Sequence, residues 1–310
     1  MPHIIIHTPG LLTTIQDQGR YGYQRFGMPV AGAMDLFSMA LCNILVGNPH
    51  DAACLEATLI GPEIIFSSSG AIAICGADMG PCINGKPISL WTTMEVKKDD
   101  RLSFTGLKTG CRTYIAFAGG IDVPMVMNSR STYLRAKVSG FKGRALKLGD
   151  KIPLGSLHQK VSIKQVPSVL VPQYRAFQTI QILPGPEEKR FNLESIRTFL
   201  SSEYMISEQS DRMGYRLTGP KIKLPEAGAD IISAGVSPGT IQVPGNGQPI
   251  VLMADRQTTG GYTRIANVVS VHLSLLAQMK PGDRIRFKAI TLDEAQELVS
   301  IRKQVLAKMF

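Results

Sequence analysis

Hydrophobic residues along this chain mostly occur in short alternating runs, and they follow a helical spacing in only a few places. The opening run His3–Ile6 is strand-like, and Thr8–Pro29, rich in glycine and polar residues, is expected to form an ordered loop. A helix is predicted from Ala33 to Val46, because apolar residues fall on one face there. Gly47-Asn48-Pro49 then ends it.

The rest of the chain continues this mainly β pattern. From Ala53 to Ala118 short β-rich segments alternate with turns, and Ile83-Asn84-Gly85-Lys86 has the Asn-Gly signal of a type I′ hairpin. The regular strand–helix alternation of a doubly wound sheet is absent from the sequence, so a mainly β chain with a few helices (α+β) is predicted. The later elements predicted are a strand at Thr179–Leu183, a helix at Leu193–Leu200 capped by Asn192, a β-rich region at Ile231–Phe287 interrupted by a helix at Ser270–Met279, and a terminal helix at Leu292–Met309.

An internal repeat is the most informative feature of the sequence. Residues 200–287 resemble a diverged copy of residues 17–104, because three matched segments occur in the same order with similar separations. The repeat predicts two related lobes, at 1–155 and 177–289, joined by a linker at 156–176 and followed by a helix at 290–310. A polar groove between such lobes is the expected ligand site. The matched segments are Arg20–Tyr23 with Arg212–Tyr215, Ala71–Asp78 with Gln248–Asp255, and Asp100–Phe104 with Asp283–Phe287.

Composition narrows the class of protein. A length of 310 residues suits two lobes, and 30 Gly and 19 Pro favour turns and short strands. The five cysteines lie mostly in apolar runs without a CxxC pair, and the five histidines are scattered. Reduced core thiols and no metal site are therefore expected. With no long apolar run and no signal peptide, we expect a cytoplasmic protein that does not enter a membrane.

The charge of the chain is uneven. The formal net charge is +10, and the segment Arg130–Lys151 holds seven basic residues against one acid. This segment is either a solvated loop or a surface that attracts an anion or an acidic protein. Nucleic acid is not expected as a partner, because few aromatic residues interleave the basic ones and no reader motif is present.

Candidate chemistry gathers in four polar motifs that contain glycine or arginine. The run Gly80–Lys86 resembles a phosphate-binding P-loop, but Pro87 stands where Ser or Thr is needed, so no nucleotide site is predicted there. In three of the polar motifs Asp lies close to Arg, which indicates either structural ion pairs or an Arg that grips a substrate carboxylate while Asp positions it or moves a proton. The motifs are Thr14–Arg20, Asn128–Tyr133, Ser210–Gly214 and Ala254–Gly261.

Residue roles follow from this second interpretation. Gly260 and Gly261 would let backbone N–H groups approach a ligand closely. The predicted catalytic residues are Asp255, Arg256, Asp211 and Arg212. The predicted substrate-binding residues are Asp17, Arg20, Ser129, Arg130, Gln257, Thr258, Gly260 and Gly261.

The same motifs carry a family resemblance that spans roughly residues 8 to 288. The chain resembles the biotin-dependent carboxyltransferase family, also called allophanate hydrolase subunit 2, which includes the C subunit of 5-oxoprolinase. The resemblance implies two cyclophilin-like β-barrel lobes related by duplication. It is carried by Leu12–Arg20, Gly32–Asp35, Ala118–Asp122, Ser129–Tyr133, Ser210–Arg216 and Asp255–Tyr262.

The family implies three functional hypotheses. The first is the C subunit of an ATP-dependent 5-oxoprolinase, a hydrolase that opens 5-oxo-L-proline to L-glutamate with A-like and B-like subunits as partners, the complex binding ATP. The second is a carboxyltransferase acting on urea or a related amide, with biotin carried by a partner protein. The third is a regulatory partner that antagonises an inhibitor of a histidine kinase. A homo-oligomer is compatible with each hypothesis.

Overall fold

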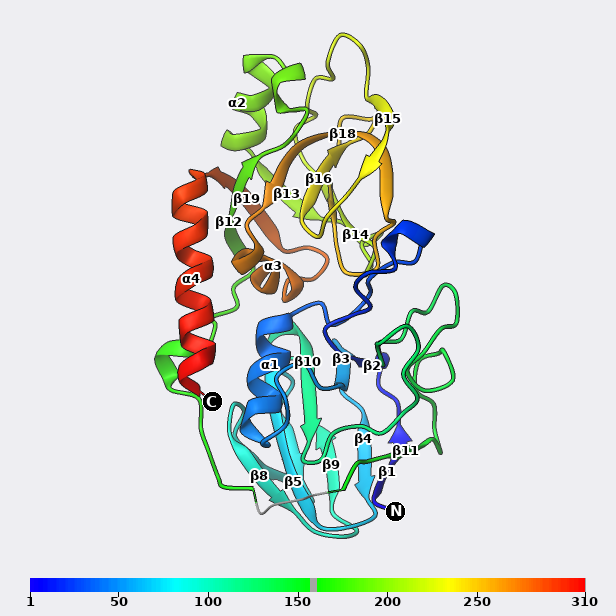
Figure 1. Cartoon of the computed structure of the whole chain (residues 1–310). Coiled ribbons are helices and arrows are strands. Elements are labelled where there is room, and N and C mark those ends of the chain that lie inside the picture. The colour runs from blue at the N-terminus through cyan, green and yellow to red at the C-terminus, as the bar shows by residue number, and fades with distance from the viewer. Residues whose placement is uncertain (157–160, 310) are drawn as a thin grey trace. The chain divides into compact units, whose positions relative to one another are not determined.

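The computed structural model describes residues 1–156 and 161–309, and their contacts divide the chain into two compact units (Figure 1). Unit 1 comprises Met1–Tyr21 and Ala31–Tyr174, and unit 2 comprises Gly22–Val30 and Arg175–Phe310. The short segment Gly22–Val30 therefore leaves the first unit and belongs to the second. Of the linker predicted at 156–176, residues 157–160 lie outside the described residues. Among the described residues, no helix combines the length and apolar character that a membrane crossing requires.

Unit 1 is built from two β-sheets and one long helix. One sheet has the strand order β11-β1-β4-β9-β6-β7 and the other β2-β3-β10-β5-β8, every pairing being antiparallel. The elements are β1 (His3–Thr8), β2 (Leu12–Gln16), α1 (Leu36–Leu45), β3 (Cys54–Thr58), β4 (Glu63–Phe66), β5 (Gly70–Asp78), β6 (Pro81–Ile83), β7 (Lys86–Pro87), β8 (Thr93–Val96), β9 (Arg101–Phe104), β10 (Thr109–Phe117), β11 (Lys151–Pro153) and the 3₁₀ turn η2 (Ser168–Leu170).

The two sheets of unit 1 share one hydrophobic core. Both contribute fully buried side chains to it, such as Ile4 and Ile64 from one sheet and Leu55 and Ile115 from the other. Helix α1 packs on β5 and β10 (Figure 1). Its residues from Phe37 to Leu45 are all buried, so the helix is covered on every side.

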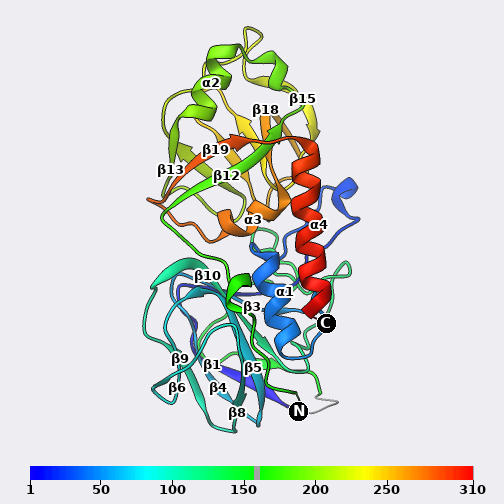
Figure 2. The ribbon, with the colours of Figure 1, turned by 90° about the vertical axis from the view of Figure 1, so that its left-hand side faces the viewer.

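Unit 2 is a closed seven-stranded β-barrel with an added edge strand. The strand order is β12-β19-β13-β14-β17-β16-β18, and pairing of β18 with β12 closes the barrel. Figure 2 shows β12 and β19, which pair in parallel, side by side in this barrel. The strands are β12 (Phe177–Pro184), β13 (Glu203–Ile206), β14 (Gly214–Thr218), β15 (Asp230–Gly235, the edge strand), β16 (Thr240–Val243), β17 (Ile250–Leu252), β18 (Thr259–Val268) and β19 (Arg284–Ala289).

Helices cover the outside of this barrel. Phe199 of α2 stacks against Phe287 of β19 with ring centroids 4.7 Å apart, which anchors that helix. Helix α3 packs on β12 and on α4, where Val271 and Ala295 are buried together. The helical elements are η1 (Gln24–Phe26), η3 (Glu188–Arg190), α2 (Leu193–Ser201), α3 (Ser270–Ala277) and α4 (Leu292–Met309).

The prediction of a mainly β chain with a few helices is therefore confirmed, and several elements match closely. The terminal helix has the predicted bounds, and Asn192 caps α2 by accepting the Ser195 N–H at 2.8 Å. The Asn-Gly hairpin joins β6 to β7, with φ of 51° at Asn84 and 78° at Gly85, as a type I′ turn requires.

Two local predictions are wrong. Strand β2 lies inside the segment predicted as a loop, because its polar Thr13, Thr14 and Gln16 are buried and disguise the strand pattern. Helix α1 begins at Leu36 instead of Ala33, because the Asp35 carboxylate accepts the Ser38 N–H at 3.0 Å and caps the helix there.

One matched pair of the internal repeat has the same local structure in both units. The Lys97 N–H donates to the Asp100 carboxylate at 2.7 Å, and the Lys280 N–H donates to Asp283 at 3.0 Å. In each turn the residue before the Asp has positive φ, and the strand that follows is β9 or β19. The sequence match at these positions therefore reflects a repeated turn and strand.

Candidate functional site

Asp17, at the end of β2, is the centre of a buried hydrogen-bond cluster in unit 1. Its carboxylate accepts the Gly19 N–H at 2.8 Å, the Ser129 hydroxyl at 2.7 Å and the Arg130 N–H at 2.5 Å. It also accepts the Ser131 hydroxyl. The Asp17 N–H in turn donates to the Ser131 Oγ at 2.9 Å. The four donors fill the carboxylate, which therefore fastens the loop at 129–131 to the end of β2.

The two arginines of these motifs lie in the same region. Arg20 is fully buried, and its guanidinium donates to the carbonyl of Ser131. Arg130 Nε donates to the carbonyl of Val123 at 2.8 Å, and its guanidinium lies 3.9 Å from the carboxylate of Asp122. The motifs Thr14–Arg20 and Asn128–Tyr133 are more than a hundred residues apart in sequence. They nevertheless form one hydrogen-bonded cluster.

The third and fourth motifs meet in unit 2 through a buried ion pair. Arg212 binds both oxygens of Asp255 with Nε and Nη2, each at 3.0 Å, and both side chains are buried. The Asp255 N–H also donates to the Arg212 carbonyl at 2.8 Å. The bidentate pair holds the loop after β17 against the start of β14.

Asp211 does not join this pair. Its side chain is exposed and accepts the N–H groups of Met213 at 2.7 Å and Gly214 at 3.2 Å, which closes a local Asx turn. The structure thus brings together Arg212 and Asp255 but places Asp211 in a different role within the same loop.

Arg256 is buried beside the edge strand β15. Its Nε lies 3.3 Å from the Val236 carbonyl and its Nη1 lies 3.4 Å from the Met253 carbonyl. Gln257 is exposed, whereas Thr258 is partly buried and its carbonyl accepts the Val236 N–H at 3.2 Å. The guanidinium therefore helps to fix the backbone on both sides of the Thr258 segment.

The two glycines that follow have different surroundings. A Cβ on Gly260 would lie 2.5 Å from the side-chain amide nitrogen of Gln242, so a side chain at this position would require the Gln242 amide to shift. A Cβ on Gly261 would meet its nearest atoms at 3.6 Å, an ordinary contact. The contact with Gln242 accounts for a glycine at position 260. Nothing in the structure accounts for a glycine at position 261.

A polar pocket of about 390 Å³ opens next to these residues in unit 2. Thr258, Ser237 and Thr240 contribute hydroxyl groups, and Asn267 and Gln24 contribute amides. Arg264 lines it as well, held by both oxygens of Glu187 at 2.7 and 2.6 Å. Of the predicted site residues, only Thr258 lines this pocket; Gln24, Ser237 and Asn267 were not identified from the sequence, because scattered hydroxyls and amides carry no motif.

A second buried polar cluster in unit 1 also escaped the sequence analysis. Tyr114 of β10 lies opposite Glu56 of β3 and donates its hydroxyl to that carboxylate at 2.7 Å. The Asp35 N–H donates to the same hydroxyl at 2.8 Å. Burial, together with the charges of Glu56 and Asp35, raises the pKa of Tyr114 well above its ordinary value, so the phenol stays protonated and acts as a donor.

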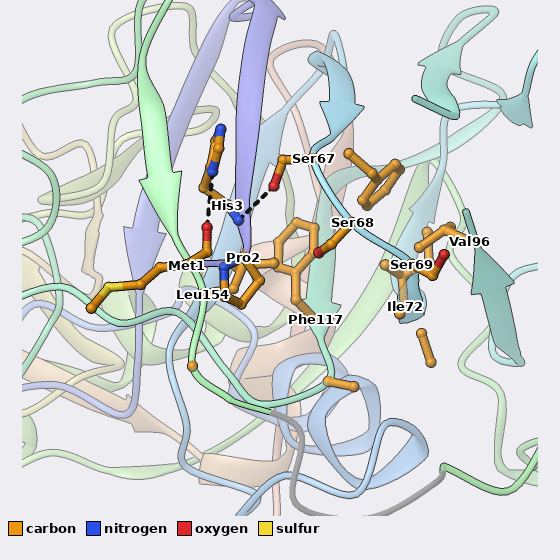
Figure 3. Close-up of a pocket in the computed structure, with 15 residues that line it drawn as sticks. Met1, Pro2, His3, Ser67, Ser68, Ser69, Ile72, Val96, Phe117 and Leu154 are labelled. Atoms are coloured by element: carbon orange, nitrogen blue, oxygen red, sulfur yellow. Dashed lines mark hydrogen bonds between the residues drawn. The ribbon is translucent and has the colours of Figure 1, made fainter. Parts of the chain in front are cut away.

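The N-terminal strand borders another cavity, of about 530 Å³, which Figure 3 shows. The side chains of Phe117, Ile72 and Val96 form its apolar part, and Ser67 at its rim accepts the His3 N–H at 2.9 Å. None of the predicted catalytic or substrate-binding residues lines it. Among the described residues, no group of three or more His, Cys, Asp or Glu side chains could hold a metal ion.

Burial also fits the expectation for the cysteines, all five of which are buried. Desolvation is the main cause that raises the pKa values of Cys54 and Cys75 well above their ordinary range. Thiols in such surroundings stay protonated and serve as small apolar side chains.

Comparison with known proteins gives consistent matches over almost the whole chain. A family model described as "Carboxyltransferase domain, subdomain A and B" matches residues 26–289. The C subunit of 5-oxoprolinase from Escherichia coli (strain K12) is 40% identical over 286 residues, which cover 92% of this chain and 91% of that protein. The urea amidolyase of Lachancea kluyveri is 36% identical over 94% of this chain, which spans only 17% of that protein.

A solved structure supports the same relationship. The crystal structure of the Kluyveromyces lactis urea carboxylase superposes with a TM-score of 0.95 and 31% sequence identity, covering 99% of this chain and 29% of that chain.

Proposed function

The chain belongs to the carboxyltransferase domain family, and from that premise we propose that it is the C subunit of an ATP-dependent 5-oxoprolinase. In this proposal it acts with A-like and B-like subunits as a cytoplasmic hydrolase that opens 5-oxo-L-proline to L-glutamate. The observation that carries the proposal is the match to the C subunit of the E. coli 5-oxoprolinase, because it extends over 92% of this chain and 91% of the relative.

The proposed reaction adds water across the lactam C–N bond, with hydrolysis of ATP driving the ring opening. In this reaction ATP would transfer its γ-phosphoryl group to the lactam oxygen and leave as ADP; one water would open the C–N bond to give an acyl phosphate, and a second water would release phosphate and leave glutamate. We assign ATP binding to the complex, because the P-loop-like run of this chain forms the β6–β7 hairpin. The role left to this chain is to bind and orient the substrate and to stabilise negative charge on its oxygens.

We propose Arg256 and Thr258 as the residues of unit 2 that serve this role most directly. Arg256 fixes the Val236 carbonyl, and both Val236 and Thr258 line the polar pocket. The cluster of Arg212 and Asp255 would support the loop that carries them. In unit 1, Asp17 with Ser129 and Arg130 would hold the second candidate loop. The groove expected between the two lobes remains a prediction.

A second function has its own support. The match to urea amidolyase and the TM-score of 0.95 to a urea carboxylase favour carboxyl transfer to urea, with biotin attached to a partner protein. This function needs a biotin carboxylase and a biotin carrier to be supplied by other chains or segments.

One assay separates the hypotheses. The chain is mixed with its A-like and B-like partners and ATP, and 5-oxo-L-proline or urea with bicarbonate and a biotinylated carrier is offered. Glutamate formed from 5-oxo-L-proline supports the proposal. Carboxylated urea without glutamate supports the second function, and tight association with the B-like partner without either product supports a regulatory role.

A further inference from the structure

The polar pocket of unit 2 presents hydrogen-bond donors to whatever occupies it. The Gln24 Oε1 accepts the Gly22 N–H at 2.9 Å, so the amide nitrogen of Gln24 remains as a donor. The Asn267 Oδ1 accepts the Thr240 hydroxyl at 2.9 Å, so the amide nitrogen of Asn267 remains as a donor as well. In both side chains the protein itself uses the oxygen and thereby orients the NH₂ group.

The wall between these amides is also fixed by the chain. The Ser237 N–H and the Ser237 hydroxyl both lie 3.2 Å from the Thr240 Oγ1, which ties the start of β16 to the preceding turn. The Arg264 guanidinium donates to the Gly235 carbonyl at 2.8 Å while Glu187 holds its other edge. The pocket walls are therefore set before any ligand arrives, which lowers the cost of binding.

The charge of the lining matches this donor pattern. No Asp or Glu occurs among the described residues that line the pocket, and the charge of Arg264, its one charged side chain, is offset by the Glu187 carboxylate behind it, so the lining offers donors without a negative charge. A ligand rich in acceptor oxygens satisfies such a lining, whereas a cationic ligand finds no partner in it. A cavity of about 390 Å³ has room for a small molecule.

We infer that this pocket is a subsite for the carboxylate of a small-molecule substrate, with Gln24, Asn267 and Thr258 as the binding residues. The inference deepens the proposed function and rests on it for the identity of the substrate, 5-oxo-L-proline, whose carboxylate the pocket would hold. Gln24 then explains why the segment Gly22–Val30 belongs to unit 2: it supplies one side of the subsite.

The test replaces the side-chain NH₂ group of one lining residue with an oxygen, which accepts hydrogen bonds and leaves the shape of the side chain unchanged. Asn267→Asp and Gln24→Glu keep the oxygen that the chain uses and replace the NH₂ group with an anionic oxygen. Asn246→Asp is the matched control, because the Asn246 Oδ1 accepts the Gln248 N–H at 3.0 Å and this exposed residue lies outside the pocket lining. Each variant adds the same charge to unit 2.

Binding is measured by calorimetric titration of the reconstituted complex without ATP, using 5-oxo-L-proline and 2-pyrrolidinone, which has the lactam but no carboxylate. We expect Asn267→Asp and Gln24→Glu to weaken 5-oxo-L-proline binding roughly tenfold or more, and Asn246→Asp to change it less than about twofold. The affinity for 2-pyrrolidinone should differ little among all four proteins. Thermal unfolding of each variant confirms that it is folded.

Equal 5-oxo-L-proline affinity in all four proteins, or no binding to the wild-type complex, overturns the subsite. Glutamate formation separates this failure from failure of the function. A complex that makes glutamate but is indifferent to Asn267→Asp retains the proposed function and loses the subsite. A complex that makes no glutamate, yet binds 5-oxo-L-proline in a manner sensitive to Asn267→Asp, retains the subsite and loses the function.

Discussion

Individual carboxylates of the candidate motifs differ in how their oxygens are used. Asp17 accepts four donors, Asp255 accepts both arms of one guanidinium, and exposed Asp211 closes a turn. A carboxylate whose oxygens are filled by the protein organises its surroundings more readily than it moves a proton. The residues therefore divide into those that fasten loops and those that line the pocket.

Replacing Asp17 with Asn tests the first role. Asn offers one acceptor oxygen in place of two, and its NH₂ group would face donors such as the Ser129 hydroxyl. We expect the free energy of unfolding to fall by about 2–4 kcal/mol in urea denaturation. The control Asp122→Asn, at an exposed carboxylate 3.9 Å from Arg130, should change it by less than about 0.5 kcal/mol. Equal effects of the two substitutions would contradict the assignment.

Asp255→Asn removes the carboxylate charge that pairs with the buried Arg212 guanidinium. Breaking one partner of a buried pair typically destabilises by about 3–5 kcal/mol, and we expect a loss of that size in urea denaturation. Asp211→Asn is the neighbouring control, since an Asn oxygen can still accept the Met213 N–H. A loss below about 1 kcal/mol for Asp255→Asn, accompanied by loss of turnover, would mean that the pair serves catalysis rather than the fold.

Arg256→Ala tests the buried arginine that holds the Val236 carbonyl behind the pocket wall. We expect glutamate formation to fall about a hundredfold or more, because the backbone of Val236, which lines the pocket, loses the donor that positions it. Urea denaturation of the same variant measures what the carbonyl contacts contribute to the fold. Unchanged turnover would remove Arg256 from the site, and a loss of activity that merely follows unfolding would assign it a structural role.

Elements with a strong local signal could be predicted from the sequence, and those held by distant contacts could not. The Asn192 cap, the Asn84-Gly85 turn and the terminal helix each depend on a few neighbouring residues. Strand β2 depends on burial of Thr13 and Thr14 instead, so its sequence has no alternation of apolar and polar residues.

Candidate sites follow the same division. The motifs that contain Asp17 and Asp255 could be found because they combine Asp, Arg and Gly within a few positions. The sequence also indicated Ser129 as a site residue, but its pairing with Asp17 could not be predicted, since the two lie in segments more than a hundred residues apart. The pocket residues Gln24 and Asn267 were missed because their amides gain significance only when two distant segments meet.

The contact between η3 and β18 predicts a dependence of stability on pH. Glu187 directly precedes η3, and hydrogen bonds from Arg264 of β18 lower the pKa of the Glu187 carboxyl below its ordinary value. A carboxyl with a lowered folded-state pKa stabilises the fold above its unfolded-state pKa, and this contribution disappears as the pH falls through the folded-state value.

We expect Glu187→Gln to be less stable than the wild type at pH 7. The difference should shrink as the pH falls below about 4.3, the ordinary value for Glu. Thermal unfolding between pH 7 and pH 3 measures it, with Glu188→Gln as the control, because Glu188 forms no ion pair among the described residues. Arg144 also lowers the pKa of Asp150, so the wild type and Glu187→Gln both lose stability at low pH for this second reason. Only the difference in stability between the two proteins therefore tests the Glu187 pair. A difference that stays constant over this range would refute the pairing.

The whole chain combines a two-sheet unit and a closed barrel, with a short segment of the first half assigned to the second unit. Family membership covers both units, since the matched region extends from residue 26 to 289. The parts proposed for substrate binding therefore depend on both halves of the sequence, and we expect the intact chain to be needed for turnover.

The most direct test of the proposed function is an omission experiment. Glutamate release from 5-oxo-L-proline is followed with the A-like and B-like partners and ATP, once with this chain and once without it. We predict steady glutamate formation in the complete mixture and none above background when this chain is left out. Glutamate formed equally well without the chain, or not formed with all three proteins present, would contradict its assignment to a 5-oxoprolinase complex.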